Sequence, residues 1–306
     1  MNLPDNFPTE EELLNIIMHT ATTAWNNELY EKDIESWLKN FTGDVYPIDI
    51  ERLLALWLLT HFTYYNKSEV THLCKVLFND LIHHIVKDKG LISSKIKETI
   101  DDFFAESNII SPGSTSDSGG FIAYFFRQEN DLPTKLFNFS VENIGDQVKN
   151  LLIIDDVTLT ANHFGQASTF FTKARKLHPK KNFLMLTLVA NAEAITFLKE
   201  KFDVQVISAI TLDKRDKCFS EDSDIFSSFP DLRSQTKKFA EHYGAKTQPL
   251  SKLGYMDGQY TFGFFYNTPD NTLPIFWGKT NNWVPVLKRY HKNYYKSNYL
   301  INERFI

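Results

Sequence analysis

The feature that most constrains this chain is the stretch LLIIDDVTLTANH at residues 151–163. Four apolar residues run directly into two adjacent acids, Asp155 and Asp156. A continuous apolar run of this length favours a strand that is buried on both faces of a parallel sheet. The acids would then lie at the carboxyl end of the strand, where open α/β sheets bind ligands. We therefore expect a binding site here, in preference to the alternative of a helix cap beside a surface acid.

Small and hydroxylated residues follow the two acids, at the point where a helix is expected to begin. Thr158, Thr160 and Asn162 can offer hydroxyl, amide and backbone donors. Helix N-termini attract phosphate because their first N–H groups are unpaired and the helix dipole favours negative charge. This segment therefore predicts an anion-binding turn.

The segments after this turn alternate between helix and strand patterns. We expect helices over residues 165–177 and 192–201, and strands over residues 182–190 and 204–210. This alternation is typical of a parallel sheet with right-handed crossovers. Farther along, the chain is polar and irregular over residues 213–230, helical over 231–243 with Gly244 as its cap, and extended over 259–266.

The N-terminal third has helical periodicity throughout. Five helices are expected within residues 1–106, and no strand pattern is visible there. A Ser- and Gly-rich loop occupies residues 107–120, and the aromatic run at 121–127 predicts a strand. We therefore divide the chain into a helical region at 1–106, an α/β domain at 107–287 and a basic, aromatic tail at 288–306.

The composition argues against several classes of protein. The net charge is -5 over 306 residues, so no overall positive field favours nucleic acid. Cys74 and Cys218 are too few for a disulfide scaffold or a cysteine zinc site, and no metal site is predicted. The apolar run at 53–59 is far too short to span a bilayer, and the N-terminus has no secretory signal pattern. We expect a cytoplasmic protein without a membrane segment.

Three segments occur in an order that resembles a known family. They are SDSG at residues 116–119 followed by AYFFR at 123–127, IIDD at 153–156, and NTPDNTLPIFW at 267–277. Together they resemble the phosphoribosyltransferase-like proteins associated with bacterial conflict systems, the PRTase-CE type. The resemblance implies a phosphoribosyltransferase-like (Rossmann-like) parallel sheet flanked by helices, with an N-terminal helical region. It also implies an effector of anti-phage defence directed at a nucleotide, with a partner such as a reverse transcriptase and its nucleic acid.

The resemblance also implies roles for individual residues. Asp155 and Asp156 would contact the ribose hydroxyls as the catalytic acids, and the turn after them would wrap a 5'-phosphate. The Ser-rich loop would take the position of the pyrophosphate loop, and Mg²⁺ would bridge a pyrophosphate if the donor is phosphoribosyl pyrophosphate. The ligand-binding residues predicted in this way are Thr158, Thr160, Ala161, Asn162, His163, Ser116, Ser118, Gly119, Arg127 and Asn267.

The phosphate turn departs from the family pattern at three positions. Ala161 stands where Gly is usual, and His163 stands where Thr or Ser is usual. Leu159 occupies the place where purine-specific members carry an acidic base, so that base is absent. These differences favour a non-catalytic subunit, which binds a nucleotide as a sensor without converting it or acts as a scaffold for a partner. The retained acids instead favour an enzyme that transfers or cleaves an N-glycosidic bond. Both hypotheses remain open.

Several predicted site residues have a second interpretation. The Ser-rich loop can be a flexible connector, and Arg127 can be an ion-pair residue at the rim of the site. Asn267 lies in a segment whose composition also favours a plain turn, and His163 can contact phosphate or pack beside it. The tail interleaves Lys with Tyr, which suits single-stranded nucleic acid but equally a segment that packs its rings on the body.

Overall fold

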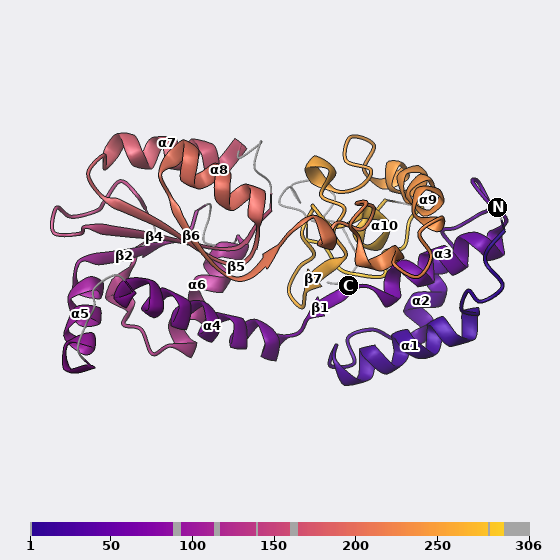
Figure 1. Ribbon diagram of the computed structural model, residues 1–306, viewed down its shortest axis with the longest axis horizontal. Helices are drawn as coiled ribbons and strands as arrows, with labels where there is room; N and C mark the ends of the chain where they lie inside the picture. The colour runs from indigo at the N-terminus through magenta and orange to yellow at the C-terminus, as the bar shows by residue number, and fades with distance from the viewer. Residues whose placement is uncertain are drawn as a thin grey trace, which may run out of the picture.

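The computed structural model describes residues 2–87, 93–112, 117–138, 140–159, 165–280 and 282–290. Figure 1 shows an elongated molecule in which a sheet flanked by helices forms one part and a largely helical body forms the other. Within the described ranges, no helix combines the length and the hydrophobicity that crossing a bilayer requires.

The main sheet has five strands in the order β3-β2-β4-β5-β6, and every neighbouring pair is parallel. The strands are β2 (Ser107–Ile110), β3 (Phe137–Asn138), β4 (Asn150–Thr158), β5 (Asn182–Asn191) and β6 (Gln205–Leu212). The predicted parallel sheet flanked by helices is therefore confirmed, and the apolar run that predicted it is the central strand, β4.

Strand β4 is buried on both faces because successive side chains of a strand point to opposite sides. Leu152 and Ile154 belong to the core on the side of α4 (Lys67–Val86) and α6 (Ser118–Glu129). Leu151 and Ile153 belong to the core on the side of α7 (Gly165–Leu177) and α8 (Ala192–Phe202). Full burial of each such side chain contributes roughly 1.5–3 kcal/mol.

The chain winds in two directions from the centre of this sheet. After β2 it passes through α6 on one face and reaches the edge strand β3. After β4 it passes through α7 on the opposite face and proceeds to β5 and β6. The loops that follow β2 and β4 therefore leave toward opposite faces. Sheets of this topology bind ligands at such a reversal point, outside the carboxyl ends of the two strands.

The second part has a core of its own, built from segments that are distant in sequence. Helices α1 (Glu10–Thr23), α2 (Glu31–Leu38) and α3 (Ile48–Thr60) share it with α9 (Leu232–Thr247) and α10 (Pro274–Trp277). Helices α4 and α5 (Ser93–Ala105) instead pack on the side of the main sheet. The N-terminal helices are thus divided between the two parts, as Figure 1 shows.

A small parallel sheet lies at the junction of the two parts. It pairs β1 (Thr63–Tyr65) with β7 (Phe262–Phe264). The expectation that no strand interrupts the N-terminal helices was wrong, because three residues that carry little local signal become a strand once β7 is beside them. The predicted strand at 259–266 is shorter than expected and pairs with β1 rather than with the main sheet.

Three further sequence predictions need correction. Residues 121–127, predicted as a strand, belong to helix α6, in which Ile122, Phe125 and Phe126 are buried at helical spacing. The segment predicted as a continuous loop at 107–120 contains β2 and the start of α6. Helix α9 (Leu232–Thr247) also continues past Gly244, where a Cβ would collide with the Lys252 carbonyl oxygen. Glycine is needed there for close backbone packing rather than as a helix cap.

Candidate functional site

The two acids lie at the carboxyl end of β4, where the chain path reverses between β2 and β4. They are not equivalent in their environment. Asp155 is half-buried, whereas the Asp156 side chain is buried and belongs to a residue that is only 7% exposed. The Asp155 carboxylate accepts a hydrogen bond from the Asp156 backbone N–H at 3.0 Å, which ties the two residues together.

Asp156 is held by donors from three parts of the chain. Its Oδ1 accepts from the Ser118 hydroxyl at 3.0 Å and from the Val157 N–H at 2.9 Å. Its Oδ2 accepts from the Tyr266 hydroxyl at 3.3 Å. Burial raises the pKa of Asp156 above its usual value, because the charged form loses its hydration, and these hydrogen bonds partly offset the rise. Both carboxylate oxygens are therefore engaged inside the protein.

Helix α6 points its N-terminus at this pair of acids. Ser118 is the first residue of the helix and contacts Asp156 directly. Gly119 follows, and a Cβ at this position would lie 2.5 Å from Ser111 Oγ, 3.0 Å from Asp155 Oδ1 and 3.2 Å from the Ile154 carbonyl oxygen. Only glycine lets the helix approach β4 so closely. The positive end of the helix dipole then stabilises negative charge on the acids or on a bound ligand.

Tyr266 completes the site, and sequence reasoning missed it. It follows β7 and reaches across 110 sequence positions to Asp156. Burial and the two nearby carboxylates raise its pKa well above the usual value, so the phenol stays a neutral donor. Its ring stacks on Phe264 at 5.3 Å and contacts Phe121 of α6 at 4.8 Å, which fixes its orientation. No local sequence pattern marks this tyrosine as a site residue.

The predicted phosphate turn is described only in part. Thr158 is buried, 2% exposed, and its hydroxyl has no hydrogen-bond partner within the described residues. Leu159 packs into the core on the α4 side. The other predicted residues of the two loops lie outside the described residues, and they are Thr160, Ala161, Asn162, His163 and Ser116.

Two predicted ligand-binding residues lie in other surroundings. Arg127 is in the last turn of α6 rather than at a strand end, roughly 14 Å along the helix axis from Ser118. Its guanidinium lies 5.8 Å from the centre of the Tyr124 ring. Asn267 accepts a hydrogen bond from the Tyr290 N–H at 3.0 Å and bonds through its own N–H to the Phe264 carbonyl, which is turn chemistry.

The first residues of the predicted tail pack against this same turn. The Arg289 guanidinium bonds to the Thr268 carbonyl oxygen and pairs with Asp270 at 3.1 Å. It also lies 4.9 Å from the Trp277 ring centre. Residues 291–306, which carry most of the Lys and Tyr residues of the tail, lie outside the described residues.

The comparisons with known proteins agree with this architecture. A family model described as PRTase-CE matches residues 34–289. The chain belongs to the PRTase-CE family. It is a phosphoribosyltransferase-like protein, as the three ordered segments predicted. No curated protein matches the chain.

Two solved structures are similar to this PRTase-CE member at low identity. One is the Helicobacter pylori xanthine-guanine-hypoxanthine phosphoribosyltransferase, which is 13% identical, with 50% of this chain and 85% of that chain covered and a TM-score of 0.31. The other is the AQ2163 protein from Aquifex aeolicus, which is 12% identical, with 61% and 86% covered and a TM-score of 0.29.

Proposed function

We propose that this PRTase-CE protein binds a phosphoribosyl ligand, a nucleotide or a ribose phosphate, at the carboxyl end of β4. One observation carries the proposal: a half-buried acid, Asp155, lies at the reversal point of the sheet and under the N-terminus of α6. Carboxylates accept hydrogen bonds from ribose hydroxyls, and a helix N-terminus attracts phosphate or pyrophosphate. Asp155 thus suits the ribose hydroxyls of such a ligand, and the N-terminus of α6 suits its phosphate groups.

The two acids would have different tasks. Asp155 is accessible enough to contact a ribose hydroxyl directly. Asp156 is buried, and Ser118, Val157 and Tyr266 already occupy its oxygens. Asp156 would therefore hold the end of β4 and the start of α6 together, so that Asp155 is presented in one orientation.

The 5'-phosphate of the ligand would bind in the turn that follows β4, whose predicted contacts are Thr158, Thr160, Ala161, Asn162 and His163, and a pyrophosphate would bind near the N-terminus of α6. Mg²⁺ is compatible with this site if the ligand supplies some of the oxygens that bind the ion. No three His, Cys, Asp or Glu side chains form a metal-binding group within the described ranges. Mg²⁺ commonly uses one or two carboxylates and takes its other oxygens from phosphate and water. Asp155 would supply such a carboxylate, and the ion would neutralise pyrophosphate charge.

The acids would also favour chemistry at the ribose. A cationic centre at C1' gains from a nearby carboxylate when an N-glycosidic bond breaks. The alternative is a nucleotide sensor without turnover. It is supported by Leu159, which is buried in the apolar core at the position where purine-specific relatives carry an acidic base. Under either proposal, the defence role and a partner such as a reverse transcriptase rest on the family resemblance.

Calorimetry with the purified full-length chain tests the binding proposal. Phosphoribosyl pyrophosphate, ribose 5-phosphate and nucleoside monophosphates would each be titrated, with and without Mg²⁺. We expect binding by at least one phosphoribosyl compound and none by ribose lacking phosphate. Chromatographic detection of released base or pyrophosphate then separates an enzyme from a sensor. Failure of every phosphoribosyl compound to bind would refute the proposal.

A further inference from the structure

A cavity lies near the proposed ribose site, at the carboxyl ends of β5 and β6. It has a volume of about 580 Å³ and is bounded by the start of α8 on one side and by the segment after β6 on the other. Thr158 of β4 pairs with Ala190 of β5, which pairs with Thr211 of β6. Strands are spaced about 4.8 Å apart, so the cavity begins about 5–10 Å from the end of β4. One ligand can therefore reach both places.

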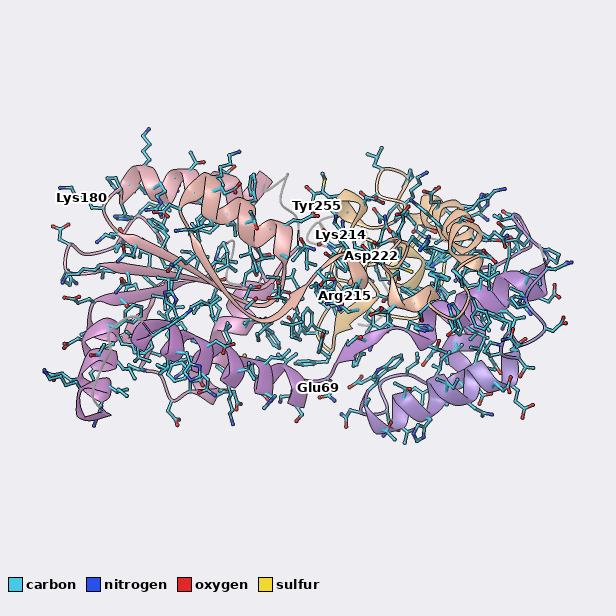
Figure 2. All side chains as sticks on the ribbon, viewed as in Figure 1. Glu69, Lys180, Lys214, Arg215, Asp222 and Tyr255 are labelled. Carbon is cyan, nitrogen blue, oxygen red and sulfur yellow. The ribbon has the colours of Figure 1, made fainter. Side chains whose placement is uncertain are left out.

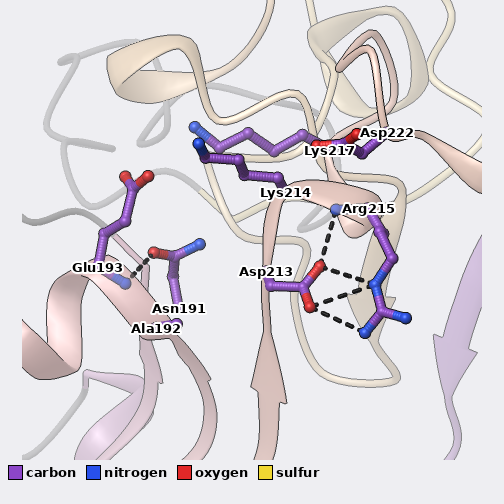
Figure 3. Close-up of a pocket in the computed structure, with 8 residues that line it drawn as sticks. All are labelled: Asn191, Ala192, Glu193, Asp213, Lys214, Arg215, Lys217 and Asp222. Carbon is purple, nitrogen blue, oxygen red and sulfur yellow. Dashed lines mark hydrogen bonds and ion pairs between the residues drawn. The ribbon is translucent and has the colours of Figure 1, made fainter.

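Two lysines that line this cavity have no counterion among the residues that the structure describes. The helix η2 (Lys214–Asp216) and the residue after it provide Lys214, Arg215 and Lys217. Arg215 is neutralised by Asp213, with contacts of 2.9 and 3.2 Å. In contrast, neither lysine ammonium has an ion-pair or hydrogen-bond partner among the described residues. Figure 3 shows the two lysine side chains running in the same direction, from η2 toward the α8 side of the cavity.

The opposite wall is the fixed N-terminus of α8. Asn191 is the cap residue and is 3% exposed. Its side-chain Oδ1 accepts a hydrogen bond from the Glu193 N–H at 2.8 Å, and its side-chain Nδ2 donates to the Tyr260 hydroxyl at 2.8 Å. These bonds hold the helix start in place, so the positive end of its dipole faces the lysines across the cavity. Sequence reasoning did not single out Asn191 or the lysines.

Two exposed acids, Glu193 and Asp222, also border the cavity. Glu193 has no ion pair within the described part of the chain, and solvent screens these acids as it screens the lysines. An anion between the lysines and α8 would be attracted by two ammonium groups and a helix dipole, and opposed by Glu193 and Asp222. Substitution of Glu193 should therefore strengthen anion binding, whereas substitution of the lysines should weaken it.

We propose that this cavity binds an anionic group, either a carboxylate or a phosphate. That group belongs to the part of the ligand joined to the ribose at C1', such as the base of a nucleotide, or to the molecule that receives the ribose there. The inference rests on the proposed phosphoribosyl site and narrows its ligand class. A nucleotide whose base bears a negative charge is bound in preference to the neutral equivalent. Lys214 and Lys217 determine that preference.

Nicotinate mononucleotide and nicotinamide mononucleotide are suitable probes, because they differ by a carboxylate in place of a carboxamide. Calorimetry with the full-length chain should give at least about tenfold tighter binding of the nicotinate form, the gain expected from charge-assisted hydrogen bonds. The double substitution Lys214→Ala, Lys217→Ala should bring the ratio close to one. Glu193→Gln should raise it.

A matched control removes two exposed lysines elsewhere. Lys97 lies on α5 and Lys180 lies at the far end of the sheet from η2, as Figure 2 shows for Lys180. The double substitution Lys97→Ala, Lys180→Ala should leave the ratio unchanged. Equal affinity of the two nucleotides for the wild-type chain would overturn a carboxylate subsite, as would loss of the preference in the control.

Inorganic phosphate tests whether the cavity binds a phosphate rather than a carboxylate, and it keeps the inference testable if neither nucleotide binds. Failure of both nucleotides to bind would count against the proposed phosphoribosyl site. The cavity would then be judged by titrating inorganic phosphate and following the backbone amide NMR signals of residues 192–194. Shifts that are present in the wild type and absent without Lys214 and Lys217 support the subsite. No shift in the wild type, together with no nucleotide preference, refutes it.

Discussion

Removal of the Tyr266 hydroxyl tests how Asp156 is held. In Tyr266→Phe, Asp156 Oδ2 loses the donor at 3.3 Å and stays buried. An unsatisfied buried acceptor costs about 1–3 kcal/mol, and the length of this bond places the expected loss at about 1–2 kcal/mol of the free energy of unfolding. The ring keeps its stacking on Phe264, so packing changes little. Urea unfolding of the full-length chain at pH 8 measures the loss.

A double-mutant cycle with Asp156→Asn isolates this contact from other effects of the substitution. If the hydroxyl acts through Asp156, Tyr266→Phe should cost at least about 1 kcal/mol less when residue 156 is already Asn. Tyr255→Phe is the matched control, because the exposed Tyr255 hydroxyl has no partner in the described residues and its loss should cost almost nothing. Equal costs of Tyr266→Phe in both backgrounds would refute this account of Asp156.

Two other substitutions follow from the same geometry. Burial raises the folded-state pKa of Asp156, so this group makes the protein less stable as the pH rises from about 4 through that pKa. Because Asn does not titrate, the unfolding free energy of Asp156→Asn should fall less between pH 4 and pH 8 than that of the wild type, by about 1.4 kcal/mol for each unit of the shift, and urea unfolding at the two pH values checks this. An identical pH dependence in both proteins would contradict it. Gly119→Ala should cost about 1–3 kcal/mol of stability and weaken phosphoribosyl binding, because a Cβ would displace Asp155 or the start of α6. Thermal unfolding and calorimetry measure both effects, and an unchanged affinity would argue against the close approach.

The parts of the fold that were predicted correctly carry local signals. Four apolar residues before Asp155 identify a doubly buried strand because each of them must be covered on one face or the other. The helices and strands that follow repeat this pattern at a regular spacing. The carboxyl end of β4 could therefore be proposed as a candidate site before the topology was known.

The parts that were predicted incorrectly depend on distant partners. In α6, the aromatic residues suit a strand by composition, and the burial of Ile122, Phe125 and Phe126 against the sheet decides for a helix. Strand β1 exists only because β7, about 200 positions later in the sequence, pairs with it. Such pairings leave almost no trace in the local sequence.

The same limit applies to the site. Asp155 and Asp156 are adjacent to the apolar run and could be predicted, but Tyr266 reaches Asp156 from 110 positions away. Asn191 could have been inferred, since it is a polar residue at the carboxyl end of the strand next to β4. Lys214 and Lys217 lie in an irregular segment whose position depends on how the second part of the molecule packs.

The most direct test of the central claim compares phosphoribosyl pyrophosphate binding by the wild-type chain and by Asp155→Asn. We expect binding by the wild type and at least about tenfold weaker binding by the variant, because an amide oxygen accepts hydrogen bonds from ribose hydroxyls less strongly than a carboxylate does. Circular dichroism and thermal unfolding would show that the variant is folded. Wild-type affinity in a folded Asp155→Asn protein would contradict the claim that the end of β4 holds the ribose.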